Sequence, residues 1–382
     1  MATLKVFQPI DMLNSYVQYG YVTIATSNHV QITSQTDSNE TFNYYGYGLT
    51  YNSQNLTGGD IVRVTHSNPV TVSGRYIHNV YEVDDFTAPA TLVESFINLG
   101  DVEGLQQYLL SGNDYVEGSP FNDRLIAWGG DDLMMGGAGS DALYGSNGND
   151  TLRGGAGDDF LIGGDGLDFA IMGGPLSNFT SRVNPDGALE LTDTAPNGNG
   201  TDYLAEIERI RFTDVVVALD TTGIAGEAYR LYKAAFDRTP DLTGLGFWIE
   251  NLDSGVSLLE AANGFINSAE FQADYGVNPS DRDFVQLLYE NVLDRQPDAS
   301  GYEYWVSAMQ NGLSRGQVLV EFSNSPENIQ NVAPLVANGI RYAPYGLSGN
   351  METANVRPMD EFDIIRSGTL SMDTSPSVFG AL

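Results

Sequence analysis

Aspartate recurs at a constant spacing of nine residues through the middle of this chain. The seven copies are Asp114, Asp123, Asp132, Asp141, Asp150, Asp159 and Asp168. An apolar side chain stands two residues after each aspartate, and a glycine stands two residues before all of them except Asp123. A period held over so many copies predicts a stack of short repeating units, because each unit of such a stack contacts only its neighbours.

The residue types in each unit suit a metal-binding turn. Glycine adopts positive φ at no steric cost, so paired glycines allow a tight turn whose carbonyl groups point to a common centre. The aspartate adds a hard anionic oxygen, and Ca²⁺ takes six to eight oxygen ligands from carboxylates and carbonyls. The three residues around the apolar position then form a short strand with one inward side chain.

This unit resembles the calcium-binding nonapeptide of RTX (repeats-in-toxin) proteins, G-G-x-G-x-D-x-U-x. The resemblance implies a parallel β-roll with Ca²⁺ as its cofactor. If two repeats form one coil, turns on the same edge are 18 residues apart, and ions between successive turns occupy at most five sites, three on one edge and two on the other. The candidate metal-binding residues are Asp132, Gly136, Gly137, Gly139, Asp141, Asp150, Gly154, Gly155, Gly157, Asp159, Gly163, Gly164 and Asp168.

A flexible linker rich in glycine and aspartate is the alternative interpretation. Seven aspartates and seven apolar residues in one register favour the roll. Without a cation the closely spaced carboxylates repel one another, and one apolar residue in nine cannot offset the conformational entropy of the chain. We therefore expect this segment to be disordered without calcium and to fold when Ca²⁺ binds.

Changes in composition predict a multidomain β plus α fold. Residues 17–24 and 42–47 are examples of short runs rich in β-branched and aromatic residues, which indicate strands, whereas helical periodicity begins near residue 228. The expected parts are an N-terminal β-rich region at 1–110, the calcium-binding β-roll at 111–174, a β cap of the roll at 175–225, an all-α repeat domain at 226–333 and an extended C-terminal segment at 334–382.

The cap is expected from a further resemblance. Residues 174–179, 200–202 and 207–212 are similar to the segment that often covers the far end of an RTX roll. Such a cover is physically reasonable, because the last coil of a roll otherwise exposes an open strand edge.

A second duplication, with a period of 57 residues, follows the cap. A tyrosine, an Asp-Arg-x-Pro-Asp-x-x-Gly turn, a tryptophan and a Ser-x-Glu motif at 232–270 recur at 289–327. The Asp-x-x-Gly turns are either a ligand or metal site, or helix-capping turns with an Asp–Arg contact and a core tryptophan, and the second interpretation is favoured. Residues 226–330 resemble an uncharacterised helical domain that is often attached to RTX rolls and to bacterial surface-layer proteins.

Charge and motifs exclude several classes of function. The 17 basic and 50 acidic residues give a net charge of −33, which argues against nucleic acid and against an anionic membrane surface as partners. No apolar run is long enough to insert into a membrane. None of the three histidines stands in an H-E-x-x-H motif, and G-x-S-x-G is absent, so the protease and lipase motifs of other RTX proteins are not present.

The RTX resemblance also implies how the protein is used. RTX proteins generally leave Gram-negative cells by type I secretion, directed by an uncleaved C-terminal signal, and the segment 334–382 is expected to carry it. We expect a secreted or cell-surface protein with a structural, adhesive or surface-layer role, whose partners are calcium ions, the secretion machinery, and further copies of itself or cell-surface glycans and proteins. The alternative is a secreted hydrolase with its active site in the N-terminal β region.

Overall fold

The computed structural model describes the backbone of seven strands between residues 3 and 89, and residues 102–185 and 187–344. Side chains are described at residues 88–89, 104–185 and 187–344. The chain divides into two compact units, Met1–Phe212 and Thr213–Leu382. The finer domain boundaries expected from the sequence stay predictions, and most of the expected secretion segment, residues 345–382, lies outside the described residues.

The N-terminal strands form an antiparallel sheet in the order β2-β3-β4-β5-β6-β1. Strand β1 also pairs in parallel with β8, the first strand of the repeat segment, so that Thr3 lies opposite Tyr115. This sheet therefore continues directly into the next part of the unit. The strands and the helix that follows them are β1 (Thr3–Val6), β2 (Gly20–Ala25), β3 (His29–Ser34), β4 (Thr41–Tyr51), β5 (Leu56–Val72), β6 (Arg75–Asp84), β7 (Ala88–Pro89) and α2 (Val102–Leu109).

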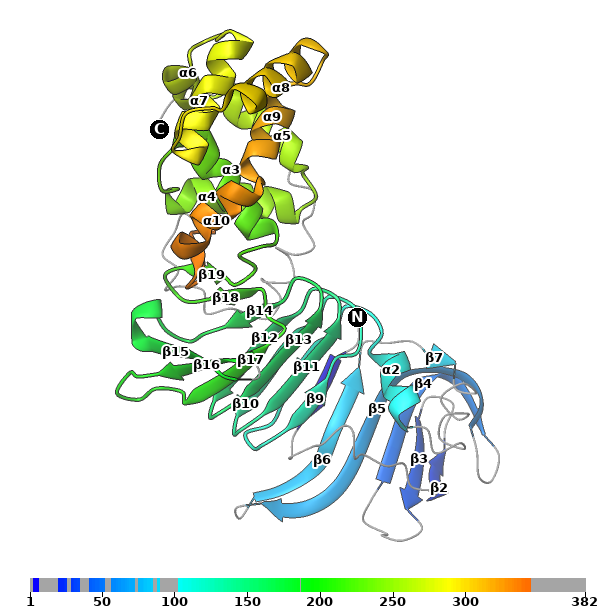
Figure 1. Ribbon diagram of the computed structural model, residues 1–382. Coiled ribbons are helices and arrows are strands. Elements are labelled where there is room, and N and C mark those ends of the chain that lie inside the picture. The colour runs from blue at the N-terminus through cyan, green and yellow to red at the C-terminus, as the bar shows by residue number, and fades with distance from the viewer. Residues whose placement is uncertain are drawn as a thin grey trace. The chain divides into compact units, whose positions relative to one another are not determined.

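The repeat segment at 111–174, called the roll below, is a parallel β-solenoid (Figure 1). Its strands are β8 (Tyr115–Glu117), β9 (Arg124–Ile126), β10 (Leu133–Ala138), β11 (Ala142–Asn147), β12 (Thr151–Ala156), β13 (Phe160–Asp165) and β14 (Phe169–Ile171). Even-numbered strands pair in one sheet and odd-numbered strands in the other, and Leu143 lies opposite Leu161. Two repeats thus form one coil, which confirms the expected β-roll.

One apolar side chain from each repeat fills the narrow space between the two sheets. Because strand residues alternate between faces, the second residue of each strand points inward. All seven of these side chains are fully buried, at 0% exposure: Val116, Leu125, Met134, Leu143, Leu152, Leu161 and Ala170. The core of the roll is therefore a single narrow stack of seven side chains, four from one sheet and three from the other.

Residues 175–212 cover the far end of the roll. A short 3-10 helix, η2 (Leu176–Asn178), leads into an antiparallel hairpin of β15 (Phe179–Val183) and β16 (Leu189–Asp193). Strands β17 (Thr201–Ala205) and β18 (Arg209–Arg211) then pair in parallel with β13 and β14. Because β16 also pairs with β17, the β15–β16 hairpin covers the open edge of the sheet that contains β9, β11, β13 and β17.

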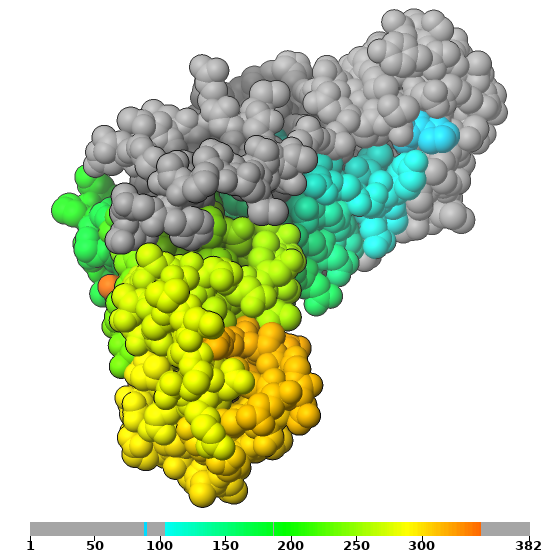
Figure 2. Space-filling model, turned by 90° about the horizontal axis from the view of Figure 1, so that it is seen from above, coloured from blue at the N-terminus to red at the C-terminus, as the bar shows by residue number. Residues whose placement is uncertain are grey.

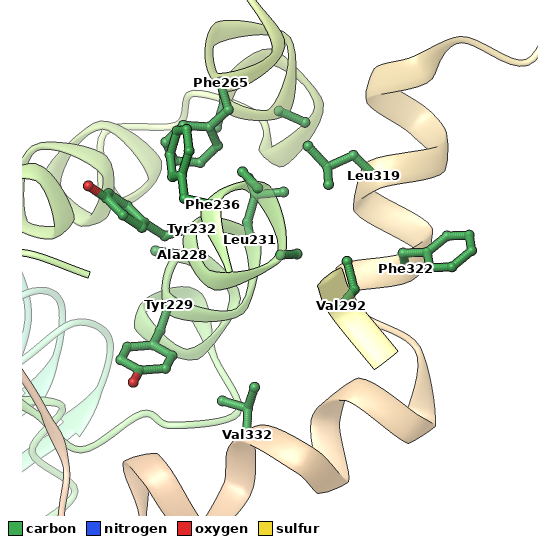
Figure 3. Packing of buried hydrophobic residues seen from close by; sticks show 14 of the residues in the cluster. Ala228, Tyr229, Leu231, Tyr232, Phe236, Phe265, Val292, Leu319, Phe322 and Val332 are labelled. Carbon is green, nitrogen blue, oxygen red and sulfur yellow. The ribbon is translucent and has the colours of Figure 1, made fainter. Parts of the chain in front are cut away.

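The second unit is mainly helical. Its elements are β19 (Val216–Ala218), α3 (Ile224–Phe236), α4 (Leu242–Asp253), α5 (Leu258–Ile266), α6 (Ala269–Tyr275), α7 (Asp281–Leu293), α8 (Ala299–Gln310), α9 (Arg315–Ser323), α10 (Pro326–Val336) and β20 (Ile340–Tyr342). Figure 3 shows α3 at the centre of the core, with Phe236 and Phe265 side by side and Leu319, Phe322 and Val332 on neighbouring helices. Figure 2 shows the outer surface of this helical unit, coloured from yellow-green to orange.

The repeated turns of the helical unit act as helix caps. The Asp241 side chain accepts a hydrogen bond from Gly244 N at the start of α4, and Asp298 does the same for Gly301 N at the start of α8. In each repeat an arginine joins the turn to the next Ser-x-Glu motif, by Arg238–Glu270 and Arg295–Glu327 pairs of 2.6 Å and 2.7 Å. Side-chain oxygens at an N-cap satisfy backbone N–H groups that the helix leaves free. The geometry therefore agrees with the structural interpretation of these turns.

We predict that the single stack determines the stability of the calcium-loaded roll. Leu152→Ala removes a fully buried side chain that has few neighbours able to move into the space, so we expect a loss of about 2–5 kcal/mol in unfolding free energy. Urea denaturation of the full chain in calcium, followed by circular dichroism, measures this loss. Val183→Ala is the control, because Val183 is 69% exposed on the hairpin. Equal effects of the two substitutions would contradict the assignment of the core.

Candidate metal site

The turns between the strands lie on the two edges of the roll and are built from glycine. The second and third glycines of the turns have positive φ, as at Gly137 (111°) and Gly139 (123°). The first position of a turn requires glycine because there is no space for a Cβ atom. A Cβ atom on Gly136 would lie 2.5 Å from Asp141 Oδ2 and 2.6 Å from the carbonyl oxygen of Gly154 in the next coil. Two oxygen atoms from neighbouring coils thus face the same glycine.

The repeat aspartates form a hydrogen-bonded ladder along each edge of the roll. The backbone N–H of one repeat aspartate donates to the Oδ1 atom of the repeat aspartate 18 residues later. The N···O distance is 2.8 Å from Asp132 to Asp150, 2.8 Å from Asp141 to Asp159 and 2.7 Å from Asp150 to Asp168. One carboxylate oxygen of each aspartate is therefore fixed by the backbone, which also fixes the direction of the other.

At the last five repeat aspartates that other oxygen has no hydrogen-bond donor among the described residues, whereas Asp123 Oδ2 accepts hydrogen bonds from Ser119 N and Oγ. The Oδ2 atom is buried and without a partner at Asp132, Asp141, Asp150, Asp159 and Asp168. A buried carboxylate oxygen without a donor is costly, and a row of them repeated at 18-residue intervals calls for a cation. Carboxylate oxygens joined by turn carbonyls are the donors that Ca²⁺ prefers, so the residues present fit a calcium ion between successive turns.

The pKa values of the ladder carboxyl groups are raised, which also indicates that the ladder needs a cation. Burial is the largest cause that raises the carboxyl pKa, and neighbouring carboxylates raise it further, while the backbone hydrogen bond partly offsets both. The pKa of Asp132 is raised to about 9, that of Asp141 to about 7, that of Asp150 to about 6 and that of Asp168 to about 7. The pKa of Asp159 is raised as well, again chiefly by burial.

The thirteen residues expected from the sequence lie on these two edges. One edge carries Asp141 and Asp159 with the glycines of 136–139 and 154–157, and the other carries Asp150 and Asp168 with Gly163 and Gly164. Asp132 continues the second ladder, but its turn has Ala127 and Trp128 in place of the paired glycines. Trp128 adopts a φ of 74° there, which a large side chain rarely does.

Sequence analysis missed Gly145. A Cβ atom on Gly145 would lie 2.7 Å from the carbonyl oxygen of Gly163 and closer still to Asp150 Oδ2, so Gly145 is equivalent to Gly136. It escaped notice because its neighbour is Ser146, which takes a φ of 85° at the second glycine position. The constant distance of five residues from the repeat aspartate was the signal that identifies it.

A second ladder, also missed, runs beside the first. The residue before each repeat aspartate is Asn, Asp or Ser in six of seven copies. Asn113 Oδ1 accepts from Asp131 N at 3.0 Å, Asp131 Oδ1 accepts from Asn149 N at 2.8 Å, and Asn149 Oδ1 accepts from Leu167 N at 2.8 Å. These short side chains hold the coils in register on the outer side of the turns.

Two residues beyond the repeats end the aspartate ladders. Asp159 N donates to Asp202 Oδ1 at 3.2 Å, and Asp168 N donates to Glu208 Oε2 at 2.9 Å. The pKa of Asp202 is raised to about 7, mainly by burial and then by Asp159. A constant nine-residue spacing could not reveal these residues, because the hairpin β15–β16 separates them from the repeats.

Comparison with protein families agrees with this geometry. Residues 109–143 and 135–170 match the model of the RTX calcium-binding nonapeptide repeat. The chain carries an RTX calcium-binding roll. Calcium is therefore the cofactor of these ladders, as expected from the sequence. Residues 228–273 and 262–332 match a domain of unknown function, DUF4214, which covers both copies of the helical repeat in the second unit.

Other comparisons add little to the RTX assignment. No curated protein matches the chain. Among solved structures, the extracellular lipase LipA from Serratia marcescens is similar over 27% of this chain and 14% of its own, with 23% identity and a TM-score of 0.14. The chain thus spans a small part of that lipase, and the likeness carries no argument about activity. No described helix is long and apolar enough to cross a membrane.

We predict that protons compete with calcium for the RTX roll. The pKa values of the ladder aspartates are raised above the unfolded value, so the ion-free roll binds more protons than the unfolded chain. The stability that these carboxyl groups contribute to the ion-free roll is then fully present below about pH 4 and is lost as pH rises through about 6 to 9. Calcium must displace the protons of the folded ion-free roll, so its apparent affinity should rise from about pH 5 to about pH 8. Calcium titrations followed by circular dichroism at several pH values measure this, and an affinity independent of pH would contradict it.

Proposed function

We propose that the protein is exported from a Gram-negative cell and acquires its structure outside by binding calcium, as a structural, adhesive or surface-layer component. The observation that carries this proposal is the double row of buried aspartates whose Oδ2 atoms have no donor among the described residues. Such a roll is poorly stable without a divalent cation. Binding of the ion and folding of the segment are therefore one process.

At the level of residues, we propose that each ion lies between two successive turns on one edge. The carboxylates of the repeat aspartates and the carbonyl groups of the turn glycines supply the oxygen ligands, and the glycines leave the space in which those oxygens converge. The proposed set is Asp132, Gly136, Gly137, Gly139, Asp141, Asp150, Gly154, Gly155, Gly157, Asp159, Gly163, Gly164 and Asp168, and we add Gly145 because its geometry matches that of Gly136.

The proposed location follows from the concentration of calcium that such sites need. Extracellular calcium modules bind at roughly 10⁻⁴–10⁻³ M, far above the free calcium inside a cell. A roll with this affinity stays unfolded during synthesis and folds after export. Type I secretion, as implied by the RTX resemblance, would deliver the chain in that unfolded form.

The proposed role rests on the parts that flank the RTX roll. The helical unit buries its repeated aromatic residues in a core, and its acidic turns serve as helix caps. This arrangement favours a structural or binding module in that unit. A secreted hydrolase remains the rival proposal. Its active site would lie in residues 1–100, where side chains other than those of residues 88–89 are outside the described part.

We predict a cooperative gain of β structure when calcium is added to the calcium-free full chain, followed by growth into larger assemblies. Circular dichroism and light scattering on the same sample measure the two steps. Folding to a persistent monomer would support calcium-dependent folding and contradict the surface-layer role. An unchanged spectrum would contradict the folding switch itself.

We also predict that Asp150→Asn weakens calcium binding by at least about tenfold, the factor that corresponds to about 1.4 kcal/mol. The asparagine oxygen still accepts the hydrogen bond from Asp132 N, so the ladder is kept while the ligand charge is lost. Isothermal titration calorimetry gives the affinity. Asp165→Asn is the matched control, because it removes the same charge from an exposed position in the next turn of that edge. Equal losses in the two variants would show a general charge effect instead of a lost ligand.

A further inference from the structure

The chain after the hairpin returns to the repeat pattern. Residues 197–205 read Asn-Gly-Asn-Gly-Thr-Asp-Tyr-Leu-Ala, which departs from the nonapeptide only at the first glycine. Gly200 has a φ of 120°, and Leu204, at 2% exposure, lies opposite Leu161 in the core stack. Tyr203 stacks on Phe160 with ring centroids 4.9 Å apart. These residues lie outside the segment that matches the RTX repeat, which ends at residue 170.

The next residues form the other half of the same coil. Ile210 lies opposite Ala170, so it takes the core position of a further repeat, and it is 2% exposed. Glu208 takes the place of the aspartate, because its Oε2 atom accepts the hydrogen bond from Asp168 N. Glu206 adopts a φ of 54°, which lies in the left-handed region that repeat turns use. The cap therefore completes one additional coil with a shortened turn.

The geometry at the start of this turn matches that of the repeats. A Cβ atom on Gly163 would lie 2.5 Å from Asp168 Oδ2 and closer still to the carbonyl oxygen of Glu206. Gly136 faces the same pair of oxygens, those of Asp141 and Gly154. Asp168 has 0% exposure, and its Oδ2 atom has no hydrogen-bond partner in the described part of the chain. A fully buried carboxylate oxygen is thus aimed at the gap between the last repeat and the cap.

We propose that the cap holds one calcium ion of its own, between the turn 163–168 and the segment 206–208. Asp168 Oδ2, the backbone carbonyl of Glu206 and the Glu208 carboxylate supply its oxygens. This site rests on the calcium binding of the repeats, since it reuses one of their turns, but two of its three ligand residues come from outside them. Its ion would fasten the cap to the last repeat and so protect the end of the roll.

The opposite edge of the cap is arranged differently. There the turn before Asp202 is organised by Asp193, whose carboxylate accepts hydrogen bonds from Ala195 N at 2.9 Å and Asn199 N at 3.1 Å. Side-chain hydrogen bonds of this kind hold a loop without an ion. The proposal is therefore restricted to the edge of Asp168 and Glu208.

The test is the number of calcium ions bound by the full chain, measured by equilibrium dialysis against calcium with elemental analysis. Glu208→Gln keeps a hydrogen-bond acceptor for Asp168 N but removes the ligand charge, and it should bind one ion fewer than the wild type. Glu206→Gln is the matched control. It removes the same charge two residues away while its backbone carbonyl stays, so its count should be unchanged.

Glu208→Asp is a second variant that keeps a carboxylate in a ladder where aspartate is the usual residue, and it should keep the wild-type count. An unchanged count in Glu208→Gln, an equal loss in Glu206→Gln or a loss in Glu208→Asp would each overturn the cap site. Circular dichroism separates this failure from that of the proposed function: a wild type without calcium-dependent β structure refutes the folding switch, whereas a normal switch with an unchanged count refutes only the cap site.

Discussion

The structure of the roll depends on how the five repeat aspartates from Asp132 to Asp168 divide their two carboxylate oxygens. One oxygen accepts the backbone N–H of the preceding coil, which sets the spacing and register of the coils. The other is left buried and without a donor, which makes the same register unfavourable until a cation arrives. A single residue type thus supplies both the register of the coils and the requirement for calcium.

Much of this architecture is predictable from the sequence because the roll is built from local units. The nine-residue period determines the turn, the strand and the single core position of each repeat, and the 57-residue period does the same for the helical unit. Asp241 and Asp298 show that cap chemistry can be predicted from a short motif, since their hydrogen bonds reach only three residues along the chain. Contacts that recur at a fixed separation along the chain can therefore be predicted from the sequence.

Prediction from the sequence fails where the register is interrupted or where backbone strain is tolerated. Asp202 and Glu208 continue the ladders, but the hairpin shifts them out of the nine-residue spacing, and a glutamate replaces the aspartate. Trp128 and Ser146 adopt positive φ because the coils on either side force the turn, which their residue types do not indicate. The second ladder corresponds to a preference for Asn, Asp and Ser before each repeat aspartate. The backbone N–H groups that donate to these side chains lie 18 residues away along the chain.

The parallel pairing of β1 with β8 has a consequence for the order of folding. This contact joins Leu4 to Val116, which lie more than a hundred residues apart along the chain, and β1 has only four residues to offset the entropy cost of bringing them together. It becomes favourable only when β8 already presents an ordered edge, which the first coil of the roll provides. The pairing of β1 with β8 then follows the first coil of the roll, and hydrogen-exchange protection along that edge of β1 reports on the calcium-bound solenoid behind it.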